Sequence, residues 1–135
     1  MVRLKRRAEF LAAAKGLRLH APSFVLQAVA RPEAPDRVGV GFTVTRKLGG
    51  AVERNRIRRR LREAVRAAAD ALEAGGLDIV IVARGTALTC PFAELVRSLR
   101  AAFADPRLAR LRARSSGPSS RRSDGSSAAS STPTG

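Results

Sequence analysis

Large and small side chains alternate in one segment of the chain, and apolar residues recur at wider spacing in others. Between Val38 and Thr45 the sequence VGVGFTVT places valine or phenylalanine at every second position, with glycine or threonine between them. Successive side chains of a strand point to opposite faces, so this pattern predicts a strand with one apolar face and one small, polar face. Two other apolar runs of strand length are SFVLQAVA at 23–30 and LDIVIVAR at 77–84. The latter is nearly continuous, which is typical of a strand covered on both faces.

Three further segments have the composition and spacing of helices. RAEFLAAAKG at 7–16 is short, rich in alanine and closed by a glycine, the usual stop residue. The segment bounded by the glycine pairs at 49–50 and 75–76 is long and rich in helix formers. The sequence PFAELVRSLRAAF at 91–103 begins with a proline that suits a first helical turn. Its apolar residues at three- and four-residue spacing are expected in the core: Phe92, Leu95, Leu99 and Phe103.

These elements follow in the order helix, strand, strand, helix, strand, helix, without an internal repeat. Because the first two strands are adjacent in sequence, a regular alternation of strands and helices is excluded. We expect an α+β fold, a two-layer α/β sandwich with a small central sheet and room for an extra short strand. The length of the chain predicts one domain, at residues 1–114. Residues 115–135 are rich in Ser, Gly, Pro and Arg and are predicted to be a disordered tail.

The small face of the strand at 38–45 carries two glycines, Gly39 and Gly41. Glycine weakens a strand, so two of them on one face indicate that another group approaches the backbone closely. The residues leave two explanations open. Either a helix of the same chain packs on this face, or a ligand does.

The charge of the chain narrows the class of partner. The sequence has 26 Lys and Arg against 11 Asp and Glu, giving a net charge of +15. Such an excess indicates a polyanionic partner, with nucleic acid favoured and an anionic membrane as the runner-up. The chain has no apolar run of about 20 residues that would span a bilayer, and its basic N-terminus lacks an apolar signal core. We therefore expect a cytoplasmic protein that does not insert into a membrane.

Six arginines and one asparagine fall within ERNRIRRRLRE at 53–63. On a helical wheel a core stripe separates from a polar side, which holds Asn55, Arg56, Arg59, Arg62 and Arg66. Arginines three or four residues apart repel each other, and few glutamates offset this. Because a guanidinium can bridge phosphates and an amide can bind a base edge or a sugar hydroxyl, the segment predicts a polyanion-binding face. RNA is preferred over DNA because the usual groove-reading motifs are missing from the sequence.

Catalytic and metal-binding constellations are missing from the sequence. His20 and Cys90 are the single histidine and the single cysteine, and the carboxylates form no suggestive pair. We interpret Cys90 as a small apolar residue. No catalytic residue, metal ligand or cofactor bound by the protein alone is expected.

The stretch GVGFTVTRKLGGAVERNRIRRRLREAVR at 39–66 resembles the protein component of bacterial ribonuclease P. A strand of small residues, a basic pair, a Gly-Gly turn and the signature Arg54, Asn55, Arg56 follow in the order and spacing of that family. RLKRRAEFLAAAKG at 3–16 and LDIVIVARGTA at 77–87 are similar to its flanking segments, so the resemblance covers about residues 3–105.

The resemblance implies a fold like domain 2 of ribosomal protein S5 and a role as the RNA-binding subunit of a tRNA-processing endoribonuclease. The family protein binds a large catalytic RNA, and the complex removes the 5′ leader of precursor tRNA with Mg2+ used by that RNA. The implied partners are the catalytic RNA and precursor tRNA, with no further protein required. The alternative is a structural RNA-binding protein or RNA chaperone without a tRNA-processing role. A free-standing nuclease is a third reading.

Carried over to this chain, the resemblance also implies which residues bind which RNA. The RNA subunit is expected at Arg54, Asn55, Arg56, Arg58, Arg59, Arg62 and Arg66. The leader and tRNA are expected at Phe10, Lys15, Thr43, Thr45, Arg46 and Lys47. This assignment favours ligand approach at the glycine face. Ala14 and Gln27 stand where family members often carry aromatic residues, so leader affinity is expected to depend more on charge than on stacking.

Overall fold

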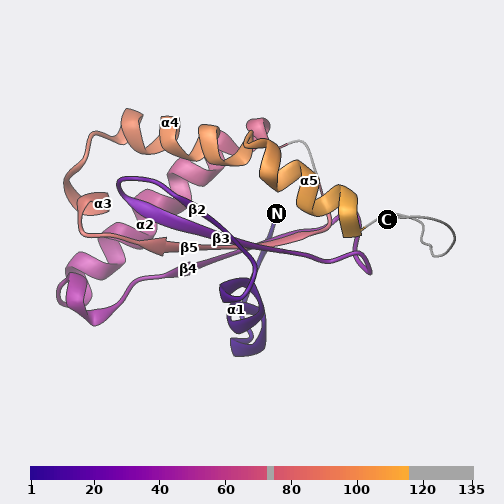
Figure 1. Ribbon diagram of the computed structural model, residues 1–135. Helices are drawn as coiled ribbons and strands as arrows, with labels where there is room; N and C mark the ends of the chain where they lie inside the picture. The colour runs from indigo at the N-terminus through magenta and orange to yellow at the C-terminus, as the bar shows by residue number, and fades with distance from the viewer. Residues whose placement is uncertain (73–74, 116–135) are drawn as a thin grey trace, which may run out of the picture.

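A five-stranded sheet organises the part of the chain that the structure, a computed structural model, describes: residues 1–72 and 75–115. Helix α1 lies on one face of the sheet, and α2, α3, α4 and α5 lie on the other (Figure 1). The strands are β1 Val2–Arg3, β2 Leu17–His20, β3 Phe24–Ala30, β4 Val38–Thr43 and β5 Leu77–Ala83. The helices are α1 Arg7–Ala14, α2 Ala51–Ala68, α3 Thr86–Thr89, α4 Phe92–Phe103 and α5 Pro106–Ser115, with 3-10 turns η1 Arg46–Leu48 and η2 Ala69–Ala71.

The strand order is β1-β4-β5-β3-β2, with β5 at the centre. β5 pairs in parallel with β4 and antiparallel with β3, while β1 and β2 form the two edges. The arginine-rich helix α2 connects the parallel pair β4 and β5. This central position explains the nearly continuous apolar sequence of β5, which is covered on both faces as predicted.

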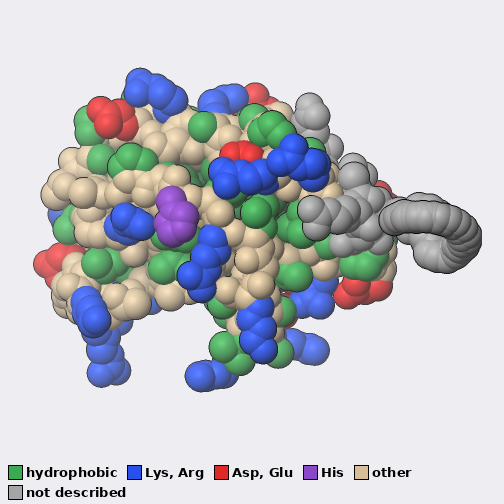
Figure 2. Space-filling model, viewed as in Figure 1, with side chains coloured by type: hydrophobic (Ala, Val, Ile, Leu, Met, Phe, Trp, Pro, Cys, Tyr) green, Lys and Arg blue, Asp and Glu red, His purple; other side chains and the backbone are tan. Residues whose placement is uncertain are grey.

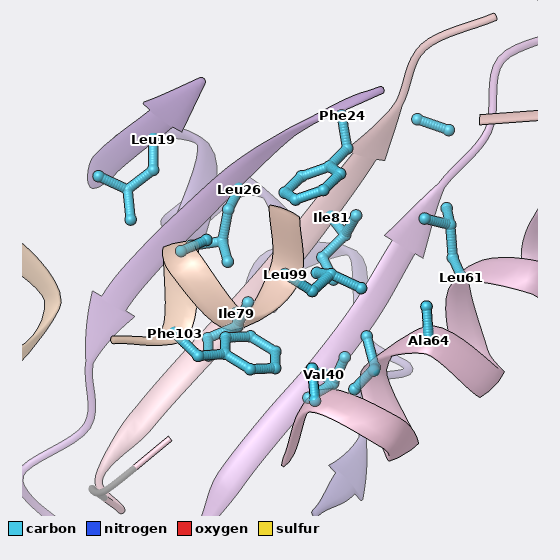
Figure 3. Packing of buried hydrophobic residues seen from close by; sticks show 14 of the residues in the cluster. Leu19, Phe24, Leu26, Val40, Leu61, Ala64, Ile79, Ile81, Leu99 and Phe103 are labelled. Carbon is cyan, nitrogen blue, oxygen red and sulfur yellow. The ribbon is translucent and has the colours of Figure 1, made fainter. Parts of the chain in front are cut away.

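The main core lies between the sheet and the α2 and α4 layer. Phe24, Leu26, Ile79 and Ile81 point from the strands toward Leu61 and Ala64 of α2 and Leu99 and Phe103 of α4 (Figure 3). The period of two in β4 is confirmed, since Val40 and Val44 join this core and Gly39 and Gly41 face away from it. The sandwich expected from the sequence is thereby formed.

A smaller core on the opposite face explains the glycines of β4. Leu4, Ala13 and Val80 are buried there, and Phe10 of α1 packs against them. A Cβ atom on Gly41 would lie 2.6 Å from Cζ of Phe10, and one on Gly39 would lie 2.5 Å from Cδ2 of Leu4. The prediction of ligand approach at these glycines is therefore wrong, because side chains of the same chain occupy the space.

Several boundaries differ from the predictions. Phe92 is 41% exposed and not in the core, because it begins α4 while Leu95 and Leu99 face the sheet. The long helix ends at Ala68, followed by η2 and an extended Leu72 through which the chain starts its return to β5. The short strands β1 and β2 and the helices α3 and α5 were not predicted individually. Ser115, placed in the predicted tail, ends α5, and the rest of that tail lies outside the described residues.

No described helix combines the length and the apolar character that a membrane crossing requires. The longest, α2, carries arginines along its surface.

Glu9 fastens the start of α1. Its Oε1 accepts hydrogen bonds from the backbone N–H groups of Arg6, at 3.0 Å, and Lys5, at 3.3 Å. Nη2 of Arg37 donates to its Oε2 at 3.2 Å. The hydrogen bond from the Arg6 backbone, supported by the other two donors, holds the pKa of this carboxyl below its usual value.

We expect Glu9→Gln to lower the denaturant midpoint of unfolding at neutral pH. A lowered folded-state pKa contributes stability that is present above the unfolded pKa and lost as pH falls through the folded one. The difference between Glu9→Gln and the wild type should therefore shrink below the usual carboxyl pKa. Chemical denaturation across this pH range measures it, with the exposed Glu63→Gln as control. A difference that persists undiminished in acid would contradict the role of the carboxylate.

Candidate nucleic-acid interface

The start of α2 is fixed by a short polar turn. Gly49 has φ +131°, a left-handed conformation that glycine adopts without strain. The N–H of Gly50 donates to Oε1 of Glu53 at 2.9 Å, which closes the first turn of the helix. A carboxylate there also suits the positive end of the helix dipole. The turn sets the direction in which the following arginines project.

Four arginines form a stripe along one flank of α2. Arg54, Arg58, Arg62 and Arg66 recur every fourth residue, so each lies about 40° around the helix from the one before. Arg54 and Arg58 are half-buried, whereas Arg62 and Arg66 are exposed and border a groove beside β1. The second half of the stripe therefore lies at the edge of the molecule where α2 meets β1 and β4.

The other members of the predicted RNA-subunit set lie around this stripe. Asn55 is exposed, and its Oδ1 accepts a hydrogen bond from Nη1 of Arg58 at 3.1 Å. Arg59 is exposed between Asn55 and Arg66 on the helix surface. Arg56 is also exposed but lies about 200° around the helix from Arg54, on the opposite flank. The five exposed members therefore share one arc of the helix surface, and the half-buried Arg54 and Arg58 lie at the border of this arc that is farther from Arg56.

Arg60 has a different role from its neighbours. Its guanidinium donates to the backbone carbonyl oxygens of Leu88 and Cys90, at the end of α3. These bonds tie α2 to the segment that leads into α4. Cys90 itself is half-buried, packs against the main core and lies 3.5 Å, Sγ to Oγ, from Ser23. Arg60 therefore stabilises the fold, and its charge is directed into the protein.

The exposed charge of α2 is not compensated by acidic side chains among the described residues. The ion pairs found in residues 1–72 and 75–111 involve other arginines, namely Arg31, Arg37, Arg100 and Arg107. Asp78, the most buried acid of these pairs, is bound to Nε of Arg31 at 2.7 Å. Because none of these ion pairs involves an arginine of α2, the flank of this helix can neutralise phosphates without first breaking one.

The second set of predicted residues lies around β4 and on the opposite face of the sheet. Thr43 ends β4, and Thr45 with Arg46 and Lys47 continues into the exposed turn η1. The ring of Phe10 packs on Gly41, which precedes Thr43 by two residues in β4. Gly41 and Thr43 therefore share one face of the strand. Lys15 is exposed at the C-terminal end of α1. Phe10 and Thr43 are thereby brought to the same face, and Arg46 and Lys47 lie at its end, where β4 turns toward α2.

A row of side chains crosses this face beyond α1. Strand pairing aligns His20 of β2, Val25 of β3, Val82 of β5 and Thr43 of β4. The two valines and Thr43 are half-buried, and His20 is exposed. The face therefore offers a shallow apolar centre with polar ends, which a single strand of nucleic acid could cross.

Two arginines of this face, Arg18 and Arg84, were not predicted. Arg18 pairs with Gln27 across β2 and β3, and Nη2 of Arg84 lies 3.5 Å from Nδ1 of His20. Figure 2 shows basic side chains on both sides of the single histidine and on the projecting α1. The alternation of Leu17 and Leu19 with Arg18 and His20 was the signal in the sequence for β2 and its polar face.

No group of three or more His, Cys, Asp or Glu side chains within the described ranges is arranged to hold a metal ion. The two surfaces described above are built instead from cationic, amide, hydroxyl and apolar groups. Those groups bind nucleic acid by contacts to phosphates, sugars and base faces.

Comparison with known proteins agrees with this arrangement. The family model described as Ribonuclease P matches residues 1–107. The ribonuclease P protein component of Gluconacetobacter diazotrophicus is 48% identical over 99 residues, covering 73% of this chain and 84% of the relative. That of Bartonella quintana is 48% identical over 103 residues, covering 72% and 77%.

Solved structures give the same result. The RNase P protein of Staphylococcus aureus superposes with a TM-score of 0.64 at 28% identity, covering 82% of this chain and 97% of that one. The RNase P protein from Thermotoga maritima superposes with a TM-score of 0.65 at 27% identity, covering 77% and 96%. The fold, the arginine-rich helix and these matches together show that the chain belongs to the ribonuclease P protein family.

Proposed function

We infer that the chain is the RNA-binding subunit of ribonuclease P, which removes the 5′ leader of precursor tRNA. The protein would bind the leader and stabilise the active form of the catalytic RNA, in the cytoplasm and without a further protein partner. The observation that carries this proposal is the uncompensated arginine flank of α2, within a chain whose family match spans residues 1–107.

The fold supports a division of labour between two RNA molecules. The arginine flank belongs to the helical layer, and the row from His20 to Thr43 lies on the other face of the sheet. The catalytic RNA would bind the flank of α2, and the leader would cross the opposite face beside Phe10. Arg46 and Lys47 lie at the connection between β4 and α2, so they extend the basic surface from one site to the other.

The contribution of the protein would be electrostatic and positional. Phosphates of two RNA segments repel each other, and neutralising arginines and lysines reduce that repulsion where the segments meet. In this proposal the hydrolytic step belongs to the RNA subunit, which uses Mg2+, and the protein alone holds no cofactor. The protein then lowers the magnesium concentration at which the RNA is active.

The face of the sheet beside Phe10, where the leader would lie, offers charged groups and apolar contact more than rings for stacking. Gln27 and Ala14 provide no ring, and the ring of Phe10 is half-buried against Gly41. Phe10 therefore has one available edge or face at most. Arg18, Arg84 and Lys15 are exposed and would bind the leader phosphates.

We expect the wild-type chain to stimulate precursor tRNA cleavage by the cognate catalytic RNA at low magnesium. The physical reason is that arginine side chains replace part of the counterion charge. The measurement is the single-turnover rate with and without protein, over a magnesium titration. The RNA alone at high magnesium serves as the control for intact catalytic RNA.

Absence of stimulation at every magnesium concentration would overturn the proposal. Stimulation accompanied by equal affinity for precursors of every leader length would favour the structural RNA-binding alternative. Cleavage by the protein without RNA would favour the free-standing nuclease.

A substitution of Phe10 tests the leader site. Phe10→Leu keeps an apolar side chain against Gly41 but removes the ring, so it should weaken binding of leader-bearing tRNA. Because a stacked base contributes about 1 to 3 kcal/mol and this ring is partly covered, we expect a loss near the lower value, about fivefold. Affinity for mature tRNA should not change. Leu11→Ala, on the same helix and 52% exposed, is the matched control; equal losses for both tRNAs would contradict the assignment.

A further inference from the structure

An apolar groove with a volume of about 470 Å³ lies between α2 and the edge strand β1. Its apolar lining comes from three elements and the turn after α2: Val2, Val40, Phe42, Val65 and Ala69. Val2 is 48% exposed, and Met1 beside it is 58% exposed. Large apolar side chains concentrated at an open groove are typical of a binding site.

The rim of this groove is cationic. Arg3 on β1 and Arg62 and Arg66 on α2 line it, and all three are exposed. None of them takes part in an ion pair within the described part of the chain. The groove therefore combines an apolar lining with three available guanidinium groups, and carries no acidic side chain among its lining residues.

We propose that this groove binds one unstacked nucleotide of an RNA strand. The base would contact the apolar lining, and the adjoining phosphates would contact Arg3, Arg62 and Arg66. This inference rests on the proposed RNA-binding function and deepens it by distinguishing a base-binding site from a purely electrostatic one. RNA exposes unstacked bases in loops and bulges, and its recognition commonly joins apolar or planar contact to the base with charge contact to the backbone.

The chemistry of the lining favours a nucleotide over other polyanions. A polyphosphate or a paired helix would engage the arginines but leave the apolar lining exposed. The arginines lie on two different elements, β1 and α2, with the apolar residues between them. A ligand that bridges these elements needs a flat or apolar part between its anionic groups, which a nucleotide within a strand supplies.

The test uses a substitution that fills the groove without changing its charge. Ala69→Trp places an indole in the lining and keeps all three arginines. Ala67→Trp, at an exposed position two residues earlier and outside the lining, is the matched control. The affinity of the full chain is measured for two labelled probes. These are a ribo-adenylate decamer and a linear polyphosphate of matched charge.

We expect Ala69→Trp to weaken binding of the decamer about tenfold, as loss of one stacked or buried base would. Binding of polyphosphate should change less than twofold, and Ala67→Trp should leave both probes unaffected. Equal weakening of both probes, or no weakening of the decamer, would overturn the proposal. If the groove instead binds lipid, Ala69→Trp should weaken binding to phosphatidylglycerol vesicles and leave binding of the decamer unchanged. That result would also overturn the proposal.

A second measurement does not depend on the folding of Ala69→Trp. A decamer that carries one 4-thiouridine is crosslinked to the wild-type chain, and the modified peptide is identified. Crosslinks at Val2 or Phe42 support the proposal, and crosslinks confined to other surfaces contradict it. Stimulated cleavage by the wild-type chain reports separately on the proposed function, so the groove can fail while that function stands.

Discussion

Burial of the apolar stripe of α2 against the sheet is the interaction on which the rest of the structure depends. The stripe consists of Ile57, Leu61, Ala64, Val65 and Ala68, all buried. Complete burial of one leucine or isoleucine contributes about 1.5 to 3 kcal/mol, whereas a like-charge pair on a helix costs about 0.2 to 0.5 kcal/mol. Two or three such residues therefore offset the repulsion among the arginines. The helix can stay folded while its outer surface remains available for phosphates.

The same helix also determines how the surfaces are distributed. Since α2 joins the parallel strands β4 and β5, its start lies next to η1 and its far end next to the return into β5. Arg62 and Arg66 border the groove beside β1 and β4, and Arg60 ties the other side of α2 to α3. With α1 packed on the opposite face, the open part of the sheet is left as a second surface. In the proposed function, two RNA segments would therefore contact the protein on different layers.

Much of this architecture follows from local sequence patterns. The alternation in VGVGFTVT, the apolar run of β5 and the stripe of α2 each depend on residues close in sequence, and all three predictions are confirmed. The short edge strand β1 has two residues, too few to show a period. The exposure of Phe92 depends on where α4 begins relative to the sheet, which spacing alone does not define.

In the candidate site, the exposure of side chains on the helix could be predicted from the sequence, but contacts between distant segments could not. Exposure of Arg59, Arg62 and Arg66 follows from the helical wheel, and the structure agrees. The inward role of Arg60 depends on carbonyl groups about 30 residues later in the chain, so no local pattern reveals it. The glycines of β4 show a similar limit. Their small size indicated close approach, but only the packing of Leu4 and Phe10 identified what approaches.

The central claim is that the exposed arginines of α2 neutralise RNA phosphates. It is tested most directly by the salt dependence of binding to the cognate catalytic RNA. The measurement compares the wild type with the double variant Arg62→Gln/Arg66→Gln and with Arg60→Gln, whose guanidinium is bound to backbone carbonyls. The slope of log K against log salt should fall by roughly 1.4 to 1.8 in the double variant, since each phosphate contact contributes about 0.7 to 0.9. Arg60→Gln should leave the slope nearly unchanged. An unchanged slope in the double variant, or an equal loss in Arg60→Gln, would contradict the account.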